Sequence, residues 1–110
     1  MTTNQEVVSG LEPPIVWQHF AAFADRPRPS GHEQEVKTYV VAWAEDHGFK
    51  CYSDEIGNLI AKVPGRGAGT EADPVILQGH LDMVCEKNSG VEHDFFTAVS
   101  YTHLTLPTKA

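Results

Sequence analysis

A run of three apolar residues, Val75-Ile76-Leu77, limits the possible folds of this 110-residue chain more than any other segment. A short segment that is apolar on both faces is typical of a strand covered on both sides in an α/β sheet. His80-Leu81-Asp82 follows two residues later, and side chains two apart on a strand share one face. The sequence therefore predicts a central strand with an imidazole and a carboxylate beyond its carboxyl end, where α/β sheets usually bind ligands.

His80 and Asp82 are residues of the kinds that bind metal ions, and together they could form part of a metal site. An imidazole can give one ring nitrogen to Zn²⁺ while a carboxylate orients the ring through the other nitrogen. The spacing alone is weak evidence, because six histidines and fifteen acidic residues produce about one His-x-acid pair by chance in a chain of this length. A structural histidine beside a solvated aspartate is the alternative interpretation.

Two helices are predicted in the first half of the chain. Pro13-Pro14 is suited to open the first helix, and the stretch from Arg26 to Pro29 ends it. The second helix is expected after Ser30, which has capping-box spacing to Glu33, and Gly48 is expected to end it. The apolar stripes that support these helices are Val16, Phe20 and Phe23 in the first and Val36, Val40 and Trp43 in the second.

A hairpin is predicted between the second helix and the central strand. Phe49 to Asp54 and Asn58 to Val63 are short strand-like segments, and the Gly of Glu55-Ile56-Gly57 suits the turn between them. The stretch from Pro64 to Asp73 has no periodicity and is expected to form a mobile loop. The residues expected to alternate inward on the second strand are Leu59, Ala61 and Val63.

The other histidines carry no predicted role in a site. His93 and Asp94 form a second imidazole–acid pair, but the stretch around them is polar and indicates a solvated loop. His32 is expected to serve a helix end, and His19 and His47 fit helix faces.

Composition disfavours two classes of partner. The formal net charge of −7 disfavours nucleic acid and anionic membranes, because both would repel the chain. The first ten residues lack a signal-peptide pattern and no apolar segment is long enough to span a bilayer, which favours a cytoplasmic location. Cys51 and Cys85 have no metal-knuckle spacing and are expected to be free thiols. A chain of 110 residues can bury one modest hydrophobic core, so at most a single domain is expected.

Residues 75–84, which read Val-Ile-Leu-Gln-Gly-His-Leu-Asp-Met-Val, resemble the strand and metal-ligand motif of the zinc aminoacylase and carboxypeptidase superfamily. The segments that resemble one branch of it, the cytosolic non-specific dipeptidases, are Pro29–Glu33, Asp54–Leu59, Cys85–Asn88 and Val91–Phe95. The likeness runs from about Pro14 to Phe95 in the right order. It implies an α/β fold that is the N-terminal part of a di-zinc peptidase catalytic domain, with two helices followed by a mixed, incomplete sheet.

The same resemblance implies a function for the full-length protein. It implies hydrolysis of a dipeptide amide bond with two Zn²⁺ ions as cofactors, His80 as a zinc ligand and Asp82 as the catalytic residue that orients it. A dipeptide is then the expected substrate, and a homodimer is a possible assembly. The family's other ligands and its glutamate base have no counterpart after Asp82, so the 110-residue chain is expected to be inactive alone.

Two alternatives stay open, and they differ in class. One is another di-zinc amidohydrolase of the superfamily, acting on an acylamino acid or a longer peptide. The other is a non-enzymatic small α/β module in which His80 and Asp82 are structural.

The end of the chain departs from the family. Residues 1–95 are interpreted as the N-terminal piece of the catalytic domain and residues 96–110 as a tail that resembles translated sequencing-adapter read-through. A short native strand, suggested by alternation at Tyr101, His103 and Thr105, is the other interpretation of this tail.

Overall fold

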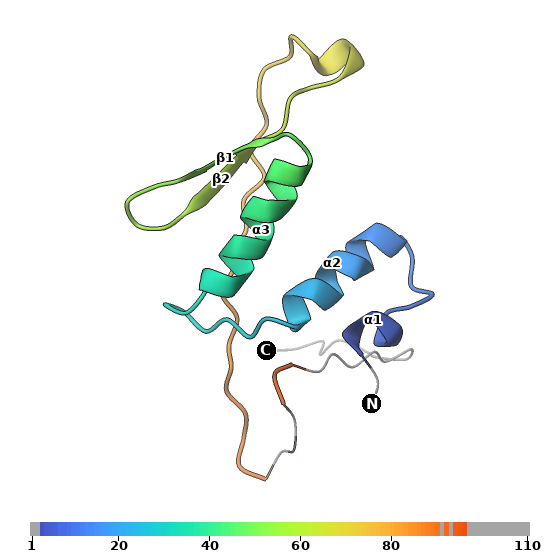
Figure 1. The fold of residues 1–110 in the computed structure, drawn as a ribbon, viewed down its shortest axis with the longest axis vertical. Coiled ribbons are helices and arrows are strands. Elements are labelled where there is room, and N and C mark those ends of the chain that lie inside the picture. The colour runs from blue at the N-terminus through green and yellow to red at the C-terminus, as the bar shows by residue number, and fades with distance from the viewer. Residues whose placement is uncertain (1–2, 91, 93, 97–110) are drawn as a thin grey trace, which may run out of the picture. The chain divides into compact units, whose positions relative to one another are not determined.

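The structure is a computed structural model that describes residues 3–90, 92 and 94–96 (Figure 1). Its contacts define two compact units, one formed by the described residues up to Pro27 together with those from Cys85 on, the other by Arg28–Val84. The elements in chain order are the helices α1 (Asn4–Val7), α2 (Pro14–Ala24) and α3 (Gln34–Asp46), the strands β1 (Lys50–Ser53) and β2 (Leu59–Lys62), and the 3₁₀ helix η1 (Gly67–Gly69).

The first unit begins with a short helix that was not predicted. α1 has a capping box in which the Glu6 amide donates to Thr3 Oγ1 at 3.1 Å and the Thr3 amide donates to Glu6 Oε2 at 3.0 Å. The buried Asn4 side chain donates to Asp25 Oδ1 at 2.5 Å and to the Phe96 carbonyl oxygen at 2.6 Å. The Thr-x-x-Glu spacing was the available signal for this helix.

α2 confirms the first predicted helix. It begins at Pro14, whose ring has the backbone angle of a first helical turn and whose missing amide proton costs the helix nothing there. Its one fully buried residue is Ala21, whereas Val16 and Phe20 of the predicted apolar stripe remain about half exposed, at 54% and 50%. Phe20 packs edge-to-face on Trp17 with ring centroids 5.4 Å apart.

α3 confirms the second predicted helix but not its predicted start. The capping box was wrong: Glu33 is the N-cap and makes no side-chain cap, and its carboxylate accepts the Gly31 amide instead, at 3.0 Å. Val36 and Ala44 are fully buried on the inner face of the helix. Gly48 follows the C-cap at φ +72°, a conformation that favours glycine, and so confirms the predicted stop.

The predicted hairpin is confirmed. β1 and β2 pair antiparallel in the register Cys51 with Ala61, and the sheet of the described residues has these two strands. The Asp54 carboxylate closes the connecting loop by accepting the amides of Ile56, Gly57 and Asn58 at 2.8 to 3.0 Å. The predicted inward alternation was wrong, because Leu59 is only half-buried and Ala61 and Val63 are exposed.

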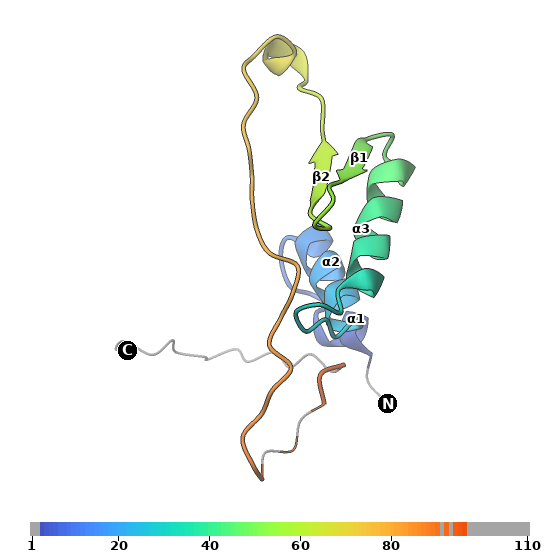
Figure 2. The same cartoon turned by 90° about the vertical axis from the view of Figure 1, so that its left-hand side faces the viewer.

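The predicted central strand is not formed among the described residues. Val75, Ile76 and Leu77 belong to an extended segment without strand pairing, and they are 84%, 87% and 94% exposed. Figure 2 shows this segment running on from η1 without a strand arrow. A strand needs a hydrogen-bonded neighbour, and the described residues supply none along this edge.

The remaining predictions concern loops and the tail. The stretch from Pro64 to Asp73 is irregular as predicted, apart from η1. The predictions for His93 and for the tail from residue 97 on fall outside the described residues. None of the helices in the part that the structure describes combines the length and the apolar character needed to cross a membrane.

Candidate functional site

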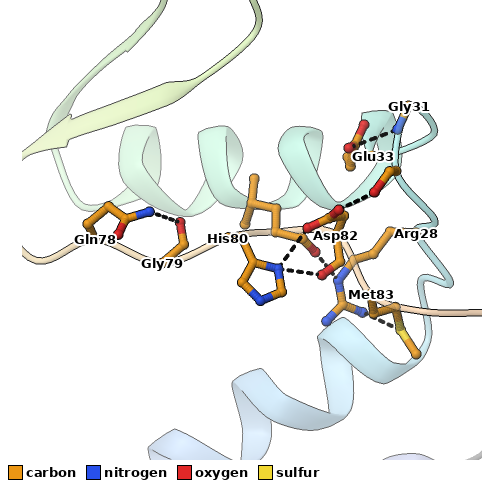
Figure 3. A network of polar contacts seen from close by, with 10 residues as sticks. Arg28, Gly31, Glu33, Gln78, Gly79, His80, Asp82 and Met83 are labelled. Carbon is orange, nitrogen blue, oxygen red and sulfur yellow. Dashed lines mark hydrogen bonds and ion pairs between the residues drawn. The ribbon is translucent and has the colours of Figure 1, made fainter.

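His80 and Asp82 form a contact pair in the second unit, on the extended segment that follows η1 (Figure 3). His80 Nδ1 lies 2.7 Å from Asp82 Oδ1 and 2.8 Å from the Asp82 carbonyl oxygen. The predicted pairing of imidazole and carboxylate is therefore present even though the strand is not, because a two-residue separation in an extended chain brings the two side chains to one side.

The contacts of His80 determine which ring nitrogen carries the proton. Both partners of Nδ1 are oxygens that only accept, since one is a carboxylate and the other a carbonyl. Nδ1 must therefore be the protonated nitrogen, and in the neutral ring Nε2 has the free lone pair. The His80 side chain is 82% exposed, so Nε2 is accessible to a ligand or a proton.

The second carboxylate oxygen of Asp82 has its own donor. The Ser30 hydroxyl donates to Asp82 Oδ2, from a position 52 residues earlier in the chain. The hydrogen bond from Ser30, followed by that from His80 and the attraction of the imidazole, lowers the pKa of Asp82 below its ordinary value. Asp82 is therefore an acceptor with both oxygens engaged, and Oδ1 is the one available to His80.

Three further hydrogen bonds join Arg28, two residues before Ser30, to the residues on either side of Asp82. Arg28 Nε donates to the Leu81 carbonyl oxygen at 2.5 Å, and the Met83 amide donates to the Arg28 carbonyl oxygen at 3.0 Å. An Arg28 guanidinium nitrogen lies 3.3 Å from Met83 Sδ. The Arg28–Ser30 segment thus contacts the residues on both sides of Asp82 as well as its side chain.

A tight turn presents the Ser30 hydroxyl. The His32 amide donates to the Pro29 carbonyl oxygen at 2.8 Å, which makes Ser30 and Gly31 the central residues of a β-turn. Gly31 has φ +88°, the conformation required at the third position of a type II turn. Because of this turn, α3 begins only at Gln34. The Ser30 hydroxyl therefore does not cap the helix and can donate to Asp82.

The hydrogen bonds and the exposure of His80 are those expected of one zinc ligand. A neutral imidazole with Nδ1 bound to a carboxylate and Nε2 exposed is the form in which histidines bind Zn²⁺. A closed zinc site takes three or four protein ligands. In residues 3–90, 92 and 94–96 no group of three or more His, Cys, Asp and Glu side chains is placed to hold a metal ion. Cys51 and Cys85 form no disulfide in the part of the chain that the structure describes.

The chain is similar to the cytosol non-specific dipeptidase of Escherichia coli (strain K12), with 40% identity over 88 residues, or 80% of the chain. A crystal structure of aminoacylhistidine dipeptidase from Vibrio alginolyticus matches 81% of the chain with a TM-score of 0.72 and 38% identity. The chain is homologous to the cytosol non-specific dipeptidases. This homology confirms the family resemblance of the motifs.

The dipeptidase match contains the whole site. An 88-residue match within 110 residues necessarily includes residues 23–88, and so Arg28, Ser30, His80 and Asp82. The chain spans 18% of the length of each of the two dipeptidases, and its helices and small antiparallel sheet match the N-terminal part of the peptidase domain, in agreement with the predicted fold class.

Other relatives have a different name. Proteins of Pyrococcus furiosus and Thermococcus kodakarensis, provisionally named LysW-lysine/LysW-ornithine hydrolase, are 34% and 38% identical over 56 residues. These matches cover 51% of the chain and 16% and 15% of the relatives. No family model matches the chain. The zinc-ligand role of His80 and the catalytic role of Asp82 stay predictions.

Proposed function

We propose that this sequence contributes part of the active site of a metal-dependent dipeptidase. The observation that carries the proposal is the 40% identity to a cytosol non-specific dipeptidase over a segment that includes His80 and Asp82. The contact geometry of the pair supports it, because His80 offers an exposed Nε2 while Asp82 holds Nδ1.

In the proposed reaction His80 would hold a Zn²⁺ ion through Nε2, and Asp82 would keep the ring in the required tautomer and orientation. Zinc, when bound, supplies Lewis-acid polarisation of the amide carbonyl and an acidified water. Asp82 accepts a hydrogen bond from the Nδ1–H group throughout and does not take the proton. The proposal requires further ligands and a general base besides the residues that the structure describes.

The proposed location of the protein rests on the name of a relative. A cytoplasmic location is proposed because the E. coli relative is named a cytosol enzyme. A dipeptide substrate is part of the proposal, and a homodimer stays a prediction.

A second candidate function is hydrolysis of an amide in a larger acylamino-acid substrate. It is favoured by the 34% and 38% identities to proteins named LysW-lysine/LysW-ornithine hydrolase. The dipeptidase match is longer, with 88 matched residues against 56, and this difference puts the dipeptide first.

A chimera tests the proposal without depending on the length of this chain. The 88 matched residues replace their counterparts in the E. coli dipeptidase, which supplies the rest of the molecule. We expect zinc-dependent hydrolysis of dipeptides that a chelator abolishes and added Zn²⁺ restores. A folded chimera that binds zinc but hydrolyses only acylamino acids would favour the second candidate. A folded chimera without hydrolysis of either substrate would contradict both.

The 110-residue chain by itself is the matched control. We expect no turnover of any dipeptide even with excess Zn²⁺, because one imidazole and one carboxylate do not close a zinc site. Zinc-dependent hydrolysis by the pure chain would show that the described residues are sufficient and that the proposed need for further ligands is wrong.

A further inference from the structure

We propose that Ser30 is a positioning residue for the His80–Asp82 pair, acting by holding one oxygen of the Asp82 carboxylate so that the other faces His80. The inference deepens the proposed function and rests on it for its catalytic meaning. Its structural content, which concerns the tautomer of His80, stands apart from any activity.

Two separate donors hold the Asp82 carboxylate. Asp82 Oδ1 accepts from His80 Nδ1 at 2.7 Å, and Asp82 Oδ2 accepts from the Ser30 hydroxyl. A carboxylate that is held by one oxygen only can rotate about its terminal torsion, which has broad and shallow minima. With both oxygens held by separate donors, the plane of the carboxylate is defined and Oδ1 stays directed at His80.

The exposure of the pair gives this second donor its importance. The Asp82 side chain is 33% exposed and that of His80 is 82% exposed, so water competes for the hydrogen bond between them. An exposed pair of this kind contributes little when its geometry is not fixed, because ordering both side chains costs conformational entropy. The hydrogen bond from Ser30 restricts the rotation of the Asp82 carboxylate and so lowers this entropic cost.

Ser30 is itself held in place. The β-turn between Pro29 and His32 sets its backbone. Arg28, two residues before Ser30, donates to the Leu81 carbonyl oxygen and accepts from the Met83 amide. The hydroxyl therefore approaches Asp82 from a backbone joined to both neighbours of Asp82. A serine hydroxyl on a free loop would not define the carboxylate in this way.

Local sequence spacing predicts a different partner for the Ser30 hydroxyl. Its spacing to Glu33 is that of a capping box, which requires its hydroxyl oxygen to accept a helix amide. In the structure the hydroxyl donates to Asp82, and Glu33 accepts from Gly31. The partner of Ser30 lies 52 residues away, and local spacing contains no information about it.

The experiment is ¹⁵N NMR of the His80 ring in the intact 110-residue chain without metal, at about pH 8.5, where an ordinary imidazole is neutral. In the unmodified chain we expect Nδ1 to have the shift of a protonated nitrogen and Nε2 that of an unprotonated one, together with nuclear Overhauser contacts between the Ser30 and Asp82 side chains. Ser30→Ala is expected to move both nitrogen shifts toward the averaged values of exchanging tautomers. Ser30→Thr keeps a hydroxyl and is expected to preserve the unmodified pattern.

Ser53→Ala is the matched control, because Ser53 is an exposed serine of the same unit whose hydroxyl lies 3.5 Å from the Asp54 carbonyl oxygen, away from the pair. It should leave His80 unchanged, and the Trp43 indole signal reports in every variant whether α3 is still folded. An unchanged His80 tautomer in Ser30→Ala would overturn the proposal, and so would missing Overhauser contacts in the unmodified chain, which need no variant. Failure of the proposed function appears elsewhere, as an inactive chimera with these NMR results intact.

Discussion

Arg28 Nε donates to the carbonyl oxygen of Leu81 at 2.5 Å, a hydrogen bond between positions 53 residues apart in the sequence. It joins the turn before α3 to the extended segment that carries His80 and Asp82. Such a bond between a charged donor and a half-buried carbonyl is among the stronger hydrogen bonds that proteins form.

Replacing Arg28 should loosen this junction. The substitution Arg28→Lys keeps the charge but removes the planar donor group, and we expect local opening to become easier by about 1.5 kcal/mol, or roughly tenfold faster exchange. The measurement is hydrogen exchange of the Met83 amide, which donates to the Arg28 carbonyl oxygen at 3.0 Å. Arg26→Lys is the control, since Arg26 bonds to Ala22 in the other unit. Equal exchange at Met83 in both variants would contradict the role of Arg28.

His80 and Asp82 should respond differently to substitution in the active chimera. His80→Ala removes the proposed metal-binding nitrogen, and we expect zinc content and rate to be lost together. Asp82→Asn keeps the imidazole and one oxygen that can accept from it but removes the carboxylate charge, and we expect much of the zinc to remain while kcat/KM falls about 10- to 100-fold. Zinc content by elemental analysis and steady-state kinetics check this. His47→Ala should retain both, because His47 caps α3 and is exposed. Normal zinc and turnover in both site variants would show the assigned roles to be wrong.

Acid should weaken the hairpin loop. The Asn58 side chain, followed by the Asn58, Gly57 and Ile56 amides, lowers the pKa of Asp54 below its ordinary value. A carboxylate whose pKa is lower in the folded state stabilises the fold fully above its unfolded pKa of about 3.9 and loses that contribution as pH falls through the folded pKa. We therefore expect the loop amide signals to stay constant above about pH 5 and to shift only below about pH 4.

Asp54→Asn provides the comparison for this titration. The amide side chain retains one oxygen acceptor but no ionisable group, so the acid shift of the Gly57 amide signal should disappear. A Gly57 signal that shifts equally in the variant would attribute the acid response to another group.

The apolar segment from Val75 to Leu77 should make the chain bind hydrophobic dye and self-associate. Its three side chains are more than four-fifths exposed, and unpaired apolar edges favour association. Ile76→Lys should lower dye fluorescence and shift sedimentation toward the monomer. Ile56→Lys is the control, because Ile56 is similarly exposed at 88% but lies alone in the polar hairpin loop. Equal effects of the two substitutions would exclude a special role for the segment.

Deleting residues 97–110 should leave dye binding and association unchanged, since the tail is interpreted as no part of the core. A cooperative monomeric melt that is lost on deletion would show instead that the tail belongs to the native structure.

Local elements were predictable because their determinants lie close together in the chain. α3 follows from the 3.6-residue spacing of Val36, Val40 and Trp43 and from the stop at Gly48. The hairpin follows from two short strand-like segments around Gly57, which has φ +103°. Interactions within a few residues are enough to specify both. The pairing of His80 with Asp82 was predictable for the same reason.

Ser30 and Val75–Leu77 mark where the sequence by itself was insufficient. The sequence alone determined the family, the two main helices, the hairpin and the imidazole–carboxylate pair, because each depends on residue types at short fixed spacings. Only the tertiary structure decided that the Ser30 hydroxyl binds Asp82 instead of capping α3, and that Val75–Leu77 has no strand partner among the described residues. The physical reason is that both outcomes depend on which groups of distant sequence position come within hydrogen-bonding distance, and periodicity or composition does not encode that choice.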